Sequence, residues 1–239
     1  VALILPWNSP IGTLIWKLAP AIAAGNTVVI KPSERASCST LELMKILEEA
    51  DLPEGLINVV TGFGPTTGAP LIEHQDVRMI SFTGGTKGGS AASLSASKNV
   101  KPIIMELGGK SPQIIFKDAD LTLSVNGVVS GIFPVSGHSC ISGSRILVHK
   151  DIKDKFTQNL LEVVKKAKVG HPNDTATQIG PIANKEQYDF ILSKIEAAEK
   201  RGLKLLIDGR KEQKSEGYYI GPTIFDNVPN EDDLAQNEV

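Results

Sequence analysis

The sequence predicts an α/β protein that begins with an open, doubly wound parallel sheet and continues into a second α/β domain. Two observations predict this fold. Short apolar runs typical of buried strands alternate with helical patterns through the first half of the chain. Glycine-rich turns follow several of these runs, as expected where parallel strands lead into helices. Strands and helices that alternate at this spacing favour βαβ units around one parallel sheet.

The strands expected in the first half are residues 1–5, 27–30, 56–60 and 79–82. The first of them is a continuous apolar run, typical of a strand that is buried on both faces. A helix with apolar residues on one face follows it, and Pro20 should kink or break that helix. A second helix is expected from about Thr40 to a point before Pro53, and a small-residue helix follows Thr86.

The strands expected in the second half are residues 102–107, 113–116 and 144–149. An Asp-capped helix should start at about Asp118. The clearest amphipathic helix of the chain carries Phe156 and Leu160 on one face. Residues 200–230 are charged and rich in Gly and Pro, which predicts strand fragments and surface loops.

The composition is that of an ordinary globular protein, with 239 residues of which 41% are hydrophobic and 22% charged. A net charge of -2 gives no electrostatic reason to expect nucleic acid or a membrane as partner. Two cysteines are too few for a disulfide framework and favour a reducing compartment, which we expect to be the cytoplasm. Since the chain starts without Met and inside a strand-like run, we expect a central piece of a longer protein.

Two glycine-rich turns follow expected strands. Gly62, Gly64 and Gly68 resemble a dinucleotide-binding fingerprint with one residue too many between the second and third glycines. The turn 83–86, with Gly84 and Gly85, follows the next strand, and backbone N–H groups in such turns can contact a pyrophosphate. Each turn alone fits a glycine turn without a ligand equally well. Two such turns at neighbouring strand ends favour a ligand site.

Lys31 and Glu34 follow the second strand at the same edge of the expected sheet. A lysine there can pair with a phosphate or a ribose hydroxyl, and a glutamate can accept a hydrogen bond from a ribose. A solvated charge pair in a loop is the alternative interpretation.

Cys140 lies in a stretch of small residues with glycines on both sides. Small neighbours leave a thiol accessible and bring backbone N–H groups close, which lowers a thiol pKa and can bind an oxyanion. The alternative is a buried, inert cysteine. Cys38 lacks flanking glycines and is expected to be structural.

Two further residues carry groups suited to acyl chemistry. Glu106 ends an apolar run before Gly108, where a carboxylate can act as a general base, or alternatively as an ion-paired acid beside Lys110. Asn8 follows the first strand and offers an amide donor for an oxyanion, or alternatively serves a turn. His138 is too close in sequence to Cys140 to act as its base, and no spacing matches a metal site.

The order of these motifs resembles the aldehyde dehydrogenase superfamily over nearly the whole chain. The motifs are Pro6-Trp7-Asn8, Lys31-Pro32-Ser33-Glu34, Gly62-Phe63-Gly64-Pro65, Phe82-Thr83-Gly84, Glu106-Leu107-Gly108-Gly109-Lys110 and Gly137-x-x-Cys140. The resemblance implies a Rossmann-like cofactor-binding domain, of which residues 1–107 are a part, joined to a catalytic domain, of which residues 108–239 are a part.

The resemblance also implies roles for single residues. Cys140 matches the family's nucleophile, which attacks the aldehyde carbonyl and passes through a thiohemiacetal and a thioester. Asn8 and the Cys140 backbone N–H would hold the oxyanion, and Glu106 would activate the water that releases the acid. Lys17 matches a supporting lysine. The implied complete enzyme is a homodimer or homotetramer.

The implied cofactor is NAD rather than NADP, because Glu34 would repel a 2′-phosphate. Departures from the family pattern are Gly85 in place of a frequent Ser and His138 in place of a frequent Gln. The residues implied to bind the cofactor are Leu5, Pro6, Trp7, Lys31, Glu34, Gly64, Pro65, Gly68, Phe82, Thr83, Gly84, Gly85, Leu107 and Glu238.

Two rival functions remain at this stage. An enzyme that releases the thioester to CoA usually lacks the base, so Glu106 argues against it. A non-catalytic remnant of the fold would not need Asn8, Glu106 and Cys140 together. The apolar character of Trp16, Phe133 and Ile141 hints at an apolar or aromatic aldehyde, although each fits a core position equally well.

Overall fold

The computed structural model describes residues 1–212, 214 and 216–239. The chain divides into two compact units, Val1–Gly108 and Gly109–Val239, and each is described by itself. The hydrophobic clusters of buried residues also fall within one unit or the other. None of the helices among these described residues is long and apolar enough to cross a bilayer.

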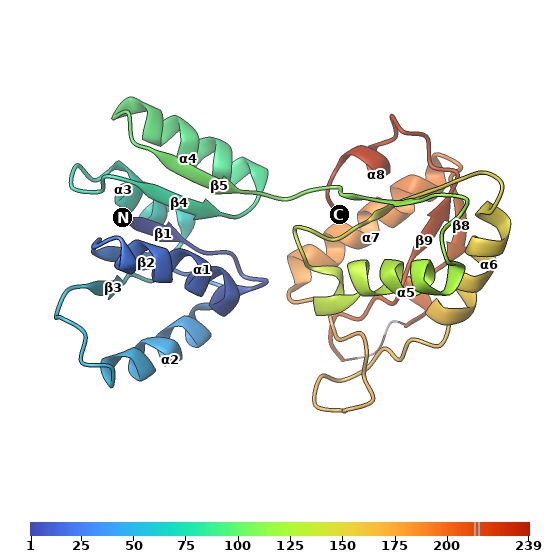
Figure 1. Ribbon diagram of the computed structural model, residues 1–239, viewed down its shortest axis with the longest axis horizontal. Coiled ribbons are helices and arrows are strands. Elements are labelled where there is room, and N and C mark those ends of the chain that lie inside the picture. The colour runs from blue at the N-terminus through green and yellow to red at the C-terminus, as the bar shows by residue number, and fades with distance from the viewer. Residues whose placement is uncertain (213, 215) are drawn as a thin grey trace. The chain divides into compact units, whose positions relative to one another are not determined.

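The first unit is built around a five-stranded parallel sheet with the strand order β3-β2-β1-β4-β5. Figure 1 shows the strands with their helices. The elements of this unit are β1 (Ala2–Ile4), α1 (Pro10–Ala23), β2 (Val28–Lys31), α2 (Ser37–Glu48), β3 (Ile57–Val59), the helical turn η1 (Gly64–Gly68), α3 (Ala69–Glu73), β4 (Ile80–Thr83), α4 (Thr86–Lys98) and β5 (Ile103–Glu106).

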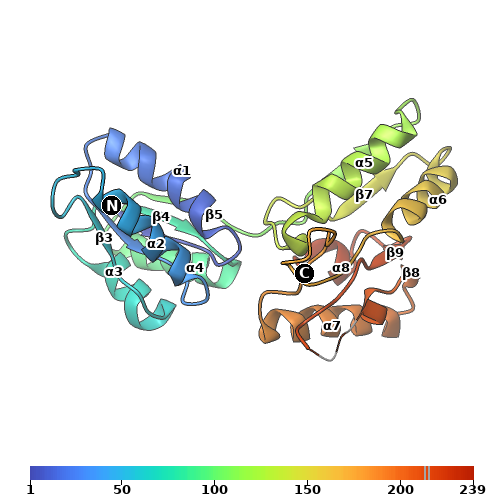
Figure 2. The same cartoon turned by 90° about the horizontal axis from the view of Figure 1, so that it is seen from below.

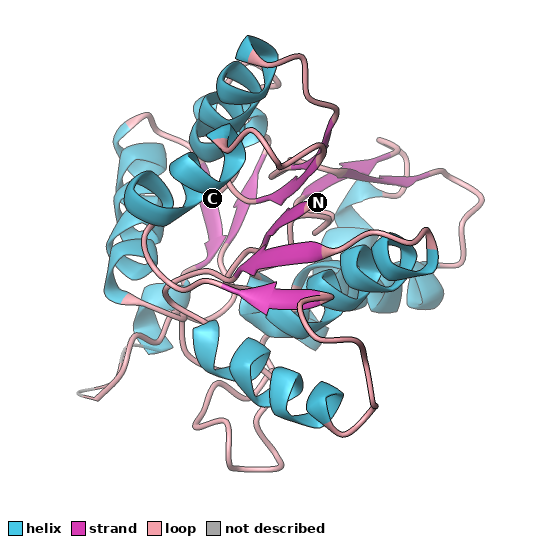
Figure 3. Ribbon diagram, turned by 90° about the vertical axis from the view of Figure 1, so that its left-hand side faces the viewer, coloured by secondary structure: helices cyan, strands magenta, loops and turns pink. Residues whose placement is uncertain are grey.

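Helices cover both faces of this sheet, as Figure 3 shows with strands in magenta between helices in cyan. On one face Leu14 and Leu18 of α1 pack against β1 and β2, together with apolar residues of α2. On the other face α3 and α4 pack against β1 and β4, and the small residues Ala92 and Ala96 allow α4 to lie close to the sheet. The strands β1 and β4 are fully buried, which explains their continuous apolar sequence. The predicted doubly wound parallel sheet is confirmed.

The second unit contains two short sheets rather than one large one: β6 and β7 pair in parallel, and β8 and β9 pair antiparallel. Helices α5 and α6 pack against these strands around the fully buried Phe156, and Figure 2 shows α5 lying beside β7. The elements are β6 (Pro112–Ile115), α5 (Leu121–Ile132), the 3₁₀ turn η2 (Pro134–Gly137), β7 (Arg145–Val148), α6 (Lys153–Val164), α7 (Lys185–Lys200), β8 (Lys204–Ile207), the 3₁₀ turn η3 (Gly209–Glu212), β9 (Ile224–Asp226) and α8 (Asp233–Gln236).

The structure corrects some local predictions. Pro20 lies inside α1 and does not break it, because the packing of Leu14 and Leu18 against the sheet holds the helix. The helix predicted from about Asp118 is capped instead by Asp120, whose carboxylate accepts a hydrogen bond from the Leu123 N–H at 2.9 Å. Helix α7 was not predicted, although Asn184 caps it and Ile195 and Ala198 are buried on one face.

Candidate active site

The candidate residues of the first unit gather at the carboxyl edge of its sheet. All five strands run in the same direction, so the segments that follow β1, β2, β3 and β4 emerge at one edge. The strand order reverses between β1 and β4, which is where ligands bind in open α/β sheets. Leu5, Pro6, Trp7 and Asn8 follow β1, and Gly84 and Gly85 follow β4, so both groups flank this reversal point.

Lys31 lies at the end of β2, with its side chain 4% exposed. Its ammonium donates to the Pro32 carbonyl at 3.0 Å and to the Glu34 carboxylate at 3.3 Å. Partial burial opposes ionisation of Glu34, but a hydrogen bond from its own backbone N–H and the Lys31 ammonium together hold its pKa below the usual value. Glu34 is therefore an ionised acceptor at neutral pH, and its side chain remains 35% exposed.

The glycine-rich turn after β3 folds against Lys31. Residues 64–68 form the turn η1, and a Cβ placed on Gly68 would lie 3.5 Å from Lys31 Cδ. Gly62 has φ +142°, and a Cβ there would overlap the Thr67 hydroxyl, so a side chain at this position is excluded. By contrast, a Cβ on Gly64 would meet no atom within 4 Å. The backbone at Gly64 is open to an incoming group, next to the exposed Pro65.

The turn after β4 has a similar open backbone. Gly84 and Gly88 pack against the Phe82 ring, where a Cβ on either would lie 3.0–3.1 Å from Phe82 Cζ. Gly85 starts α4 without a side-chain cap, and a Cβ on it would meet nothing within 4 Å. The Thr83 hydroxyl beside it is buried and has no hydrogen-bond partner among the described residues. Uncapped N–H groups at a helix start and a hydroxyl without a partner fit the binding of a phosphate-bearing cofactor here.

Lys17 of α1 contacts strand β4, where its ammonium donates to the Ser81 hydroxyl at 2.7 Å. Burial lowers the pKa of Lys17 to about 8, and the Glu106 carboxylate partly offsets that effect. Glu106 is the last residue of the edge strand β5, and its side chain is exposed. The structure therefore places Lys17 and Glu106 within electrostatic reach of each other, while Asn8 is half-buried after β1.

In the second unit Cys140 lies on the loop between α5 and β7 and is partly exposed. The loop leaves α5 through three successive left-handed residues, Val135 at φ 55°, Ser136 at φ 54° and Gly137 at φ 80°. A left-handed conformation is strained for a β-branched residue, of order 1–3 kcal/mol. The Ser136 hydroxyl accepts a hydrogen bond from the Gly180 N–H at 3.1 Å, which ties this strained segment to a distant part of the unit.

The residues next to Cys140 form a turn. The Ser142 N–H donates to the Ser139 carbonyl at 3.0 Å, so that Cys140 sits within the turn. His138 contacts its own segment, with its ring Nδ1 3.0 Å from the Val135 carbonyl oxygen. Burial lowers the pKa of His138, and the Val135 carbonyl partly opposes this, so the imidazole is neutral at neutral pH.

Gly109 brings two candidate residues together. A Cβ on Gly109 would lie 3.0 Å from the Cys140 carbonyl oxygen, so the two backbones are in close contact. The Gly109 N–H also donates to the Glu238 carboxylate, although partial burial still raises the pKa of Glu238. Burial, followed by the nearby Arg145, lowers the pKa of Lys110, while Glu238 opposes that shift. The predicted nucleophile and the carboxylate predicted to bind a ribose thus contact the same glycine.

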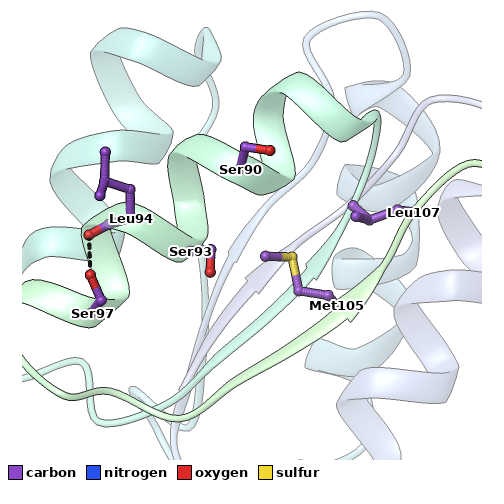
Figure 4. A pocket seen from close by; sticks show the side chains of 6 residues that line it. All are labelled: Ser90, Ser93, Leu94, Ser97, Met105 and Leu107. Carbon is purple, nitrogen blue, oxygen red and sulfur yellow. Dashed lines mark hydrogen bonds between the residues drawn. The ribbon is translucent and has the colours of Figure 1, made fainter.

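Leu107 lies just past β5, where it packs against Gly89 of α4. It also lines a shallow hollow of about 480 Å³ between α4 and β5, which Figure 4 shows with its six lining side chains. Four of them, Ser90, Ser93, Leu94 and Ser97, come from α4. The hollow lies along the flank of α4, and of the predicted site residues it involves Leu107 alone.

The structure corrects the expectation for Cys38 and identifies residues that the sequence did not. Cys38 is exposed in the first turn of α2 and is therefore not a buried structural residue. Ser81, Gly109 and Arg145 were missed, since their contacts join segments that are distant in sequence. Arg145 Nε donates to the Lys110 carbonyl at 2.7 Å, which supports the segment beside Cys140. Among the residues with defined coordinates, no group of His, Cys, Asp or Glu is arranged to hold a metal ion.

Comparison with known proteins agrees with this arrangement. Residues 1–239 match the model of the "Aldehyde dehydrogenase family". The chain is 44% identical over 237 residues to aldehyde dehydrogenase 1A1 of Gallus gallus, covering 99% of the chain and 46% of that relative. It is 41% identical over 240 residues to the chloroplastic betaine aldehyde dehydrogenase of Atriplex hortensis, covering 100% of the chain and 48% of that relative. The chain thus spans about half the length of the curated relatives it matches.

Solved structures give the same result. The chain superimposes with a TM-score of 0.96 on the NAD+ complex of an aldehyde dehydrogenase from Bacillus cereus, at 35% identity, covering 99% of the chain and 48% of that structure. It superimposes with a TM-score of 0.95 on PnpE in complex with nicotinamide adenine dinucleotide, at 41% identity, covering 99% of the chain and 49% of that structure.

Proposed function

Because the chain belongs to the aldehyde dehydrogenase family, we propose that the complete protein oxidises an aldehyde to a carboxylic acid with NAD as cofactor. The observation that carries this proposal is the contact of Gly109 with both Cys140 and Glu238, since it gathers the nucleophile and a ribose-binding carboxylate. Relatives of similar sequence are named as aldehyde dehydrogenases, and similar structures contain NAD.

The first chemical step belongs to Cys140. Its thiolate attacks the aldehyde carbon, which forms a C–S bond and moves the carbonyl electron pair onto oxygen. The Asn8 amide and the Cys140 backbone N–H donate to this oxyanion, a contribution that is typically worth a factor of 10² to 10³ per donor. NAD, when bound, supplies the two-electron hydride acceptor that converts the thiohemiacetal into a thioester.

The second step belongs to Glu106. Its carboxylate removes a proton from water, the resulting hydroxide attacks the thioester carbon, and the C–S bond breaks to release the acid and the Cys140 thiolate. An exposed side chain at the end of β5 supports this role, because a general base has to reach both water and the acyl group. Lys17, whose pKa is lowered to about 8 mainly by burial, is the supporting lysine of the proposal.

The residues for the cofactor lie at the carboxyl edge of the first sheet. Lys31 and Glu34 would hold the adenosine ribose, and the open backbones at Gly64 and Gly85 would face the adenine and the pyrophosphate. The ionised Glu34 favours NAD, because a 2′-phosphate would meet a carboxylate. The proposed cofactor site is lined by further residues of these segments, namely Pro65, Gly68, Phe82 and Leu107. The residues at the reversal point of the strand order are Leu5, Pro6, Trp7, Thr83 and Gly84.

The proposed location is the cytoplasm, and the proposed assembly is a homodimer or homotetramer. The two cysteines without a disulfide support a reducing compartment. The relatives include chloroplastic and mitochondrial proteins, so fractionation of the natural host is the direct check.

The experiment that tests the proposal is NADH production by the complete natural protein with a panel of aldehydes, compared with Cys140→Ala and Cys38→Ala. We expect Cys38→Ala to retain the activity and Cys140→Ala to lose it, because Cys140 forms the covalent intermediate. Activity that persists in Cys140→Ala would contradict the nucleophile assignment. A product that appears as an acyl-CoA when CoA is added, and as no acid without it, would favour the CoA-acylating rival, and no NADH with any aldehyde would favour a non-catalytic fold.

A further inference from the structure

The loop that carries Cys140 is closed at its base. The Gly143 N–H, three residues after Cys140, donates to the carbonyl of Gly131 at 2.9 Å. Gly131 lies in the last turn of α5, so this bond joins the two ends of residues 132–142. The position of Cys140 therefore depends on what holds this junction, which we call the loop neck (Gly131 and Gly143).

The side chain of Gln113 occupies the loop neck. Gln113 lies on β6 on the same face as Ile115, which packs into the core of the second unit. Its Nε2 donates to the Gly143 carbonyl at 2.8 Å and lies 3.4 Å from the Val128 carbonyl of α5. A polar side chain on an inward face is costly unless it is hydrogen-bonded, and here its bonds join β6, α5 and the segment after Cys140.

Both glycines of the loop neck make room for Gln113. A Cβ on Gly131 would lie 3.0 Å from the amide oxygen and nitrogen of Gln113. A Cβ on Gly143 would overlap Gln113 Cγ and lie 2.6 Å from its Cδ and Nε2. Gly127, one turn earlier on α5, has no such neighbour, since a Cβ there would meet nothing within 4 Å. Glycine inside a helix costs roughly 1 kcal/mol relative to alanine, and at Gly131 that cost is offset by the contact with Gln113.

We propose that Gln113 is a positioning residue for Cys140: its amide fixes the loop neck and thereby the direction in which the nucleophile is presented. The proposal rests on the proposed role of Cys140 as nucleophile. Gln113 acts through the backbone of Gly143, and the turn from Ser139 to Ser142 connects that backbone to Cys140. A displacement of about 1 Å at a reacting group is enough to lower a rate about 100-fold.

The test compares Gln113→Leu with the unaltered complete protein. Leucine has a similar volume but no amide donor, so the Gly143 carbonyl loses its partner while the core stays filled. We expect kcat to fall about tenfold or more with the KM for NAD changed less than about twofold. Most residues proposed for the cofactor lie in the first unit, and Glu238 is held by the Gly109 N–H rather than by Gln113.

A second measurement separates positioning from general damage to the fold. Iodoacetamide labels both Cys140 and the exposed Cys38, and mass spectrometry gives the two rates within the same molecules. We expect the ratio of the Cys140 rate to the Cys38 rate to fall about tenfold in Gln113→Leu, because the turn that carries Cys140 loses the backbone position fixed by Gln113. An unchanged ratio with an unchanged kcat overturns the proposal.

Two alanine variants of α5 form a matched pair. Gly131→Ala forces the Gln113 amide to shift by a few tenths of an ångström and should lower kcat and the labelling ratio in the same direction as Gln113→Leu. Gly127→Ala points into open space and should behave like the unaltered protein. If kcat and the labelling ratio fall equally in Gly131→Ala and Gly127→Ala, the proposal is overturned. This comparison remains valid even if Gln113→Leu does not fold. If the unaltered protein shows no Cys140-dependent NADH production, the proposed function fails, and the labelling ratio still reports separately on the loop neck.

Discussion

In the first unit the candidate residues follow regular strands, whereas in the second the proposed nucleophile, Cys140, lies on an irregular loop that side chains hold in place. The strands β1, β2 and β4 place Asn8, Lys31 and Gly85 at one edge simply because parallel strands end together. Cys140 depends instead on Gln113, on Ser136 and on contact with Gly109. The geometry of the parallel sheet is enough to bring the binding groups of the first unit together, whereas Cys140 is positioned by specific side-chain and backbone contacts.

The helices of the two units also start differently. In the first unit α1, α2 and α4 start without a side-chain hydrogen bond at the N-cap. In the second unit α5, α7 and α8 are capped by Asp120, Asn184 and Asp232, whereas α6 starts without such a bond. Uncapped N–H groups at the edge of the sheet leave donors for an anionic ligand, at some cost in stability. Capped helices instead contribute stability to the scaffold around the loop.

The largest effect that tests this comparison is expected in the two cores. Phe156→Ala should lower the free energy of unfolding of the second unit by about 3–5 kcal/mol, and Leu14→Ala that of the first by about 2–5 kcal/mol, because both side chains are fully buried. Hydrogen exchange should show each effect confined to residues 109–239 or 1–108. Leu123→Ala, at a side chain that is 71% exposed, is the control and should change little. Increased exchange throughout the chain in either core variant would contradict separate units.

A smaller effect should follow the pH dependence of Lys17. Its pKa is about 8 in the folded unit and 10.5 in the reference state, so between these values the unfolded chain holds a proton that the folded chain has lost. The free energy of unfolding should therefore rise with pH in this window, by at most about 1.4 kcal/mol per unit and less because the group is partly solvated. Lys17→Met should lack this rise, measured by urea unfolding at pH 7 and at about pH 9.5. Parallel pH profiles for the two proteins would show that the ammonium is not desolvated.

The smallest effect is expected at the helix caps. Asp120→Ala should destabilise the second unit by about 1 kcal/mol, because it leaves the Leu123 N–H without its acceptor. Ser9→Ala, at the corresponding position of α1, should change stability by a few tenths of a kcal/mol at most, since that serine makes no cap hydrogen bond. Thermal unfolding measures both losses of stability, and equal losses would remove the distinction between the capped helix α5 and the uncapped helix α1.

The sequence predicted the first unit better than the second for a physical reason. Continuous apolar runs and glycine turns identify buried parallel strands, so β1, β2, β3 and β4 were predicted within a residue or two. At Pro20 the packing of α1 on the sheet outweighs the local rule for proline in helix interiors, so the helix continues to Ala23. Helix α7 was overlooked although Asn184 and the spacing of Tyr188, Ile191 and Ile195 indicate it.

The contacts that hold the Cys140 loop could not be predicted from sequence patterns. Gln113 occurs in a run that predicts a strand, and nothing in that run says which carbonyl its amide reaches. Gly131 and Gly143 look like flexible positions, yet each is small because the Gln113 side chain occupies the adjacent space. The same holds for Ser81, whose hydroxyl pairs with an ammonium from a different element. Such contacts join distant segments, and only the folded chain brings them together.

The contact between Gly109 and Glu238 has a consequence for biosynthesis. These residues lie near opposite ends of the second unit, so at roughly 5–20 residues per second the ribosome releases Glu238 many seconds after Gly109. The residues of the first unit, Val1–Gly108, are all synthesised before this interval begins. The contacts around Cys140 are complete only after the segment with Glu238 has been synthesised. Until then the Cys140 thiol of a nascent chain lacks its final surroundings.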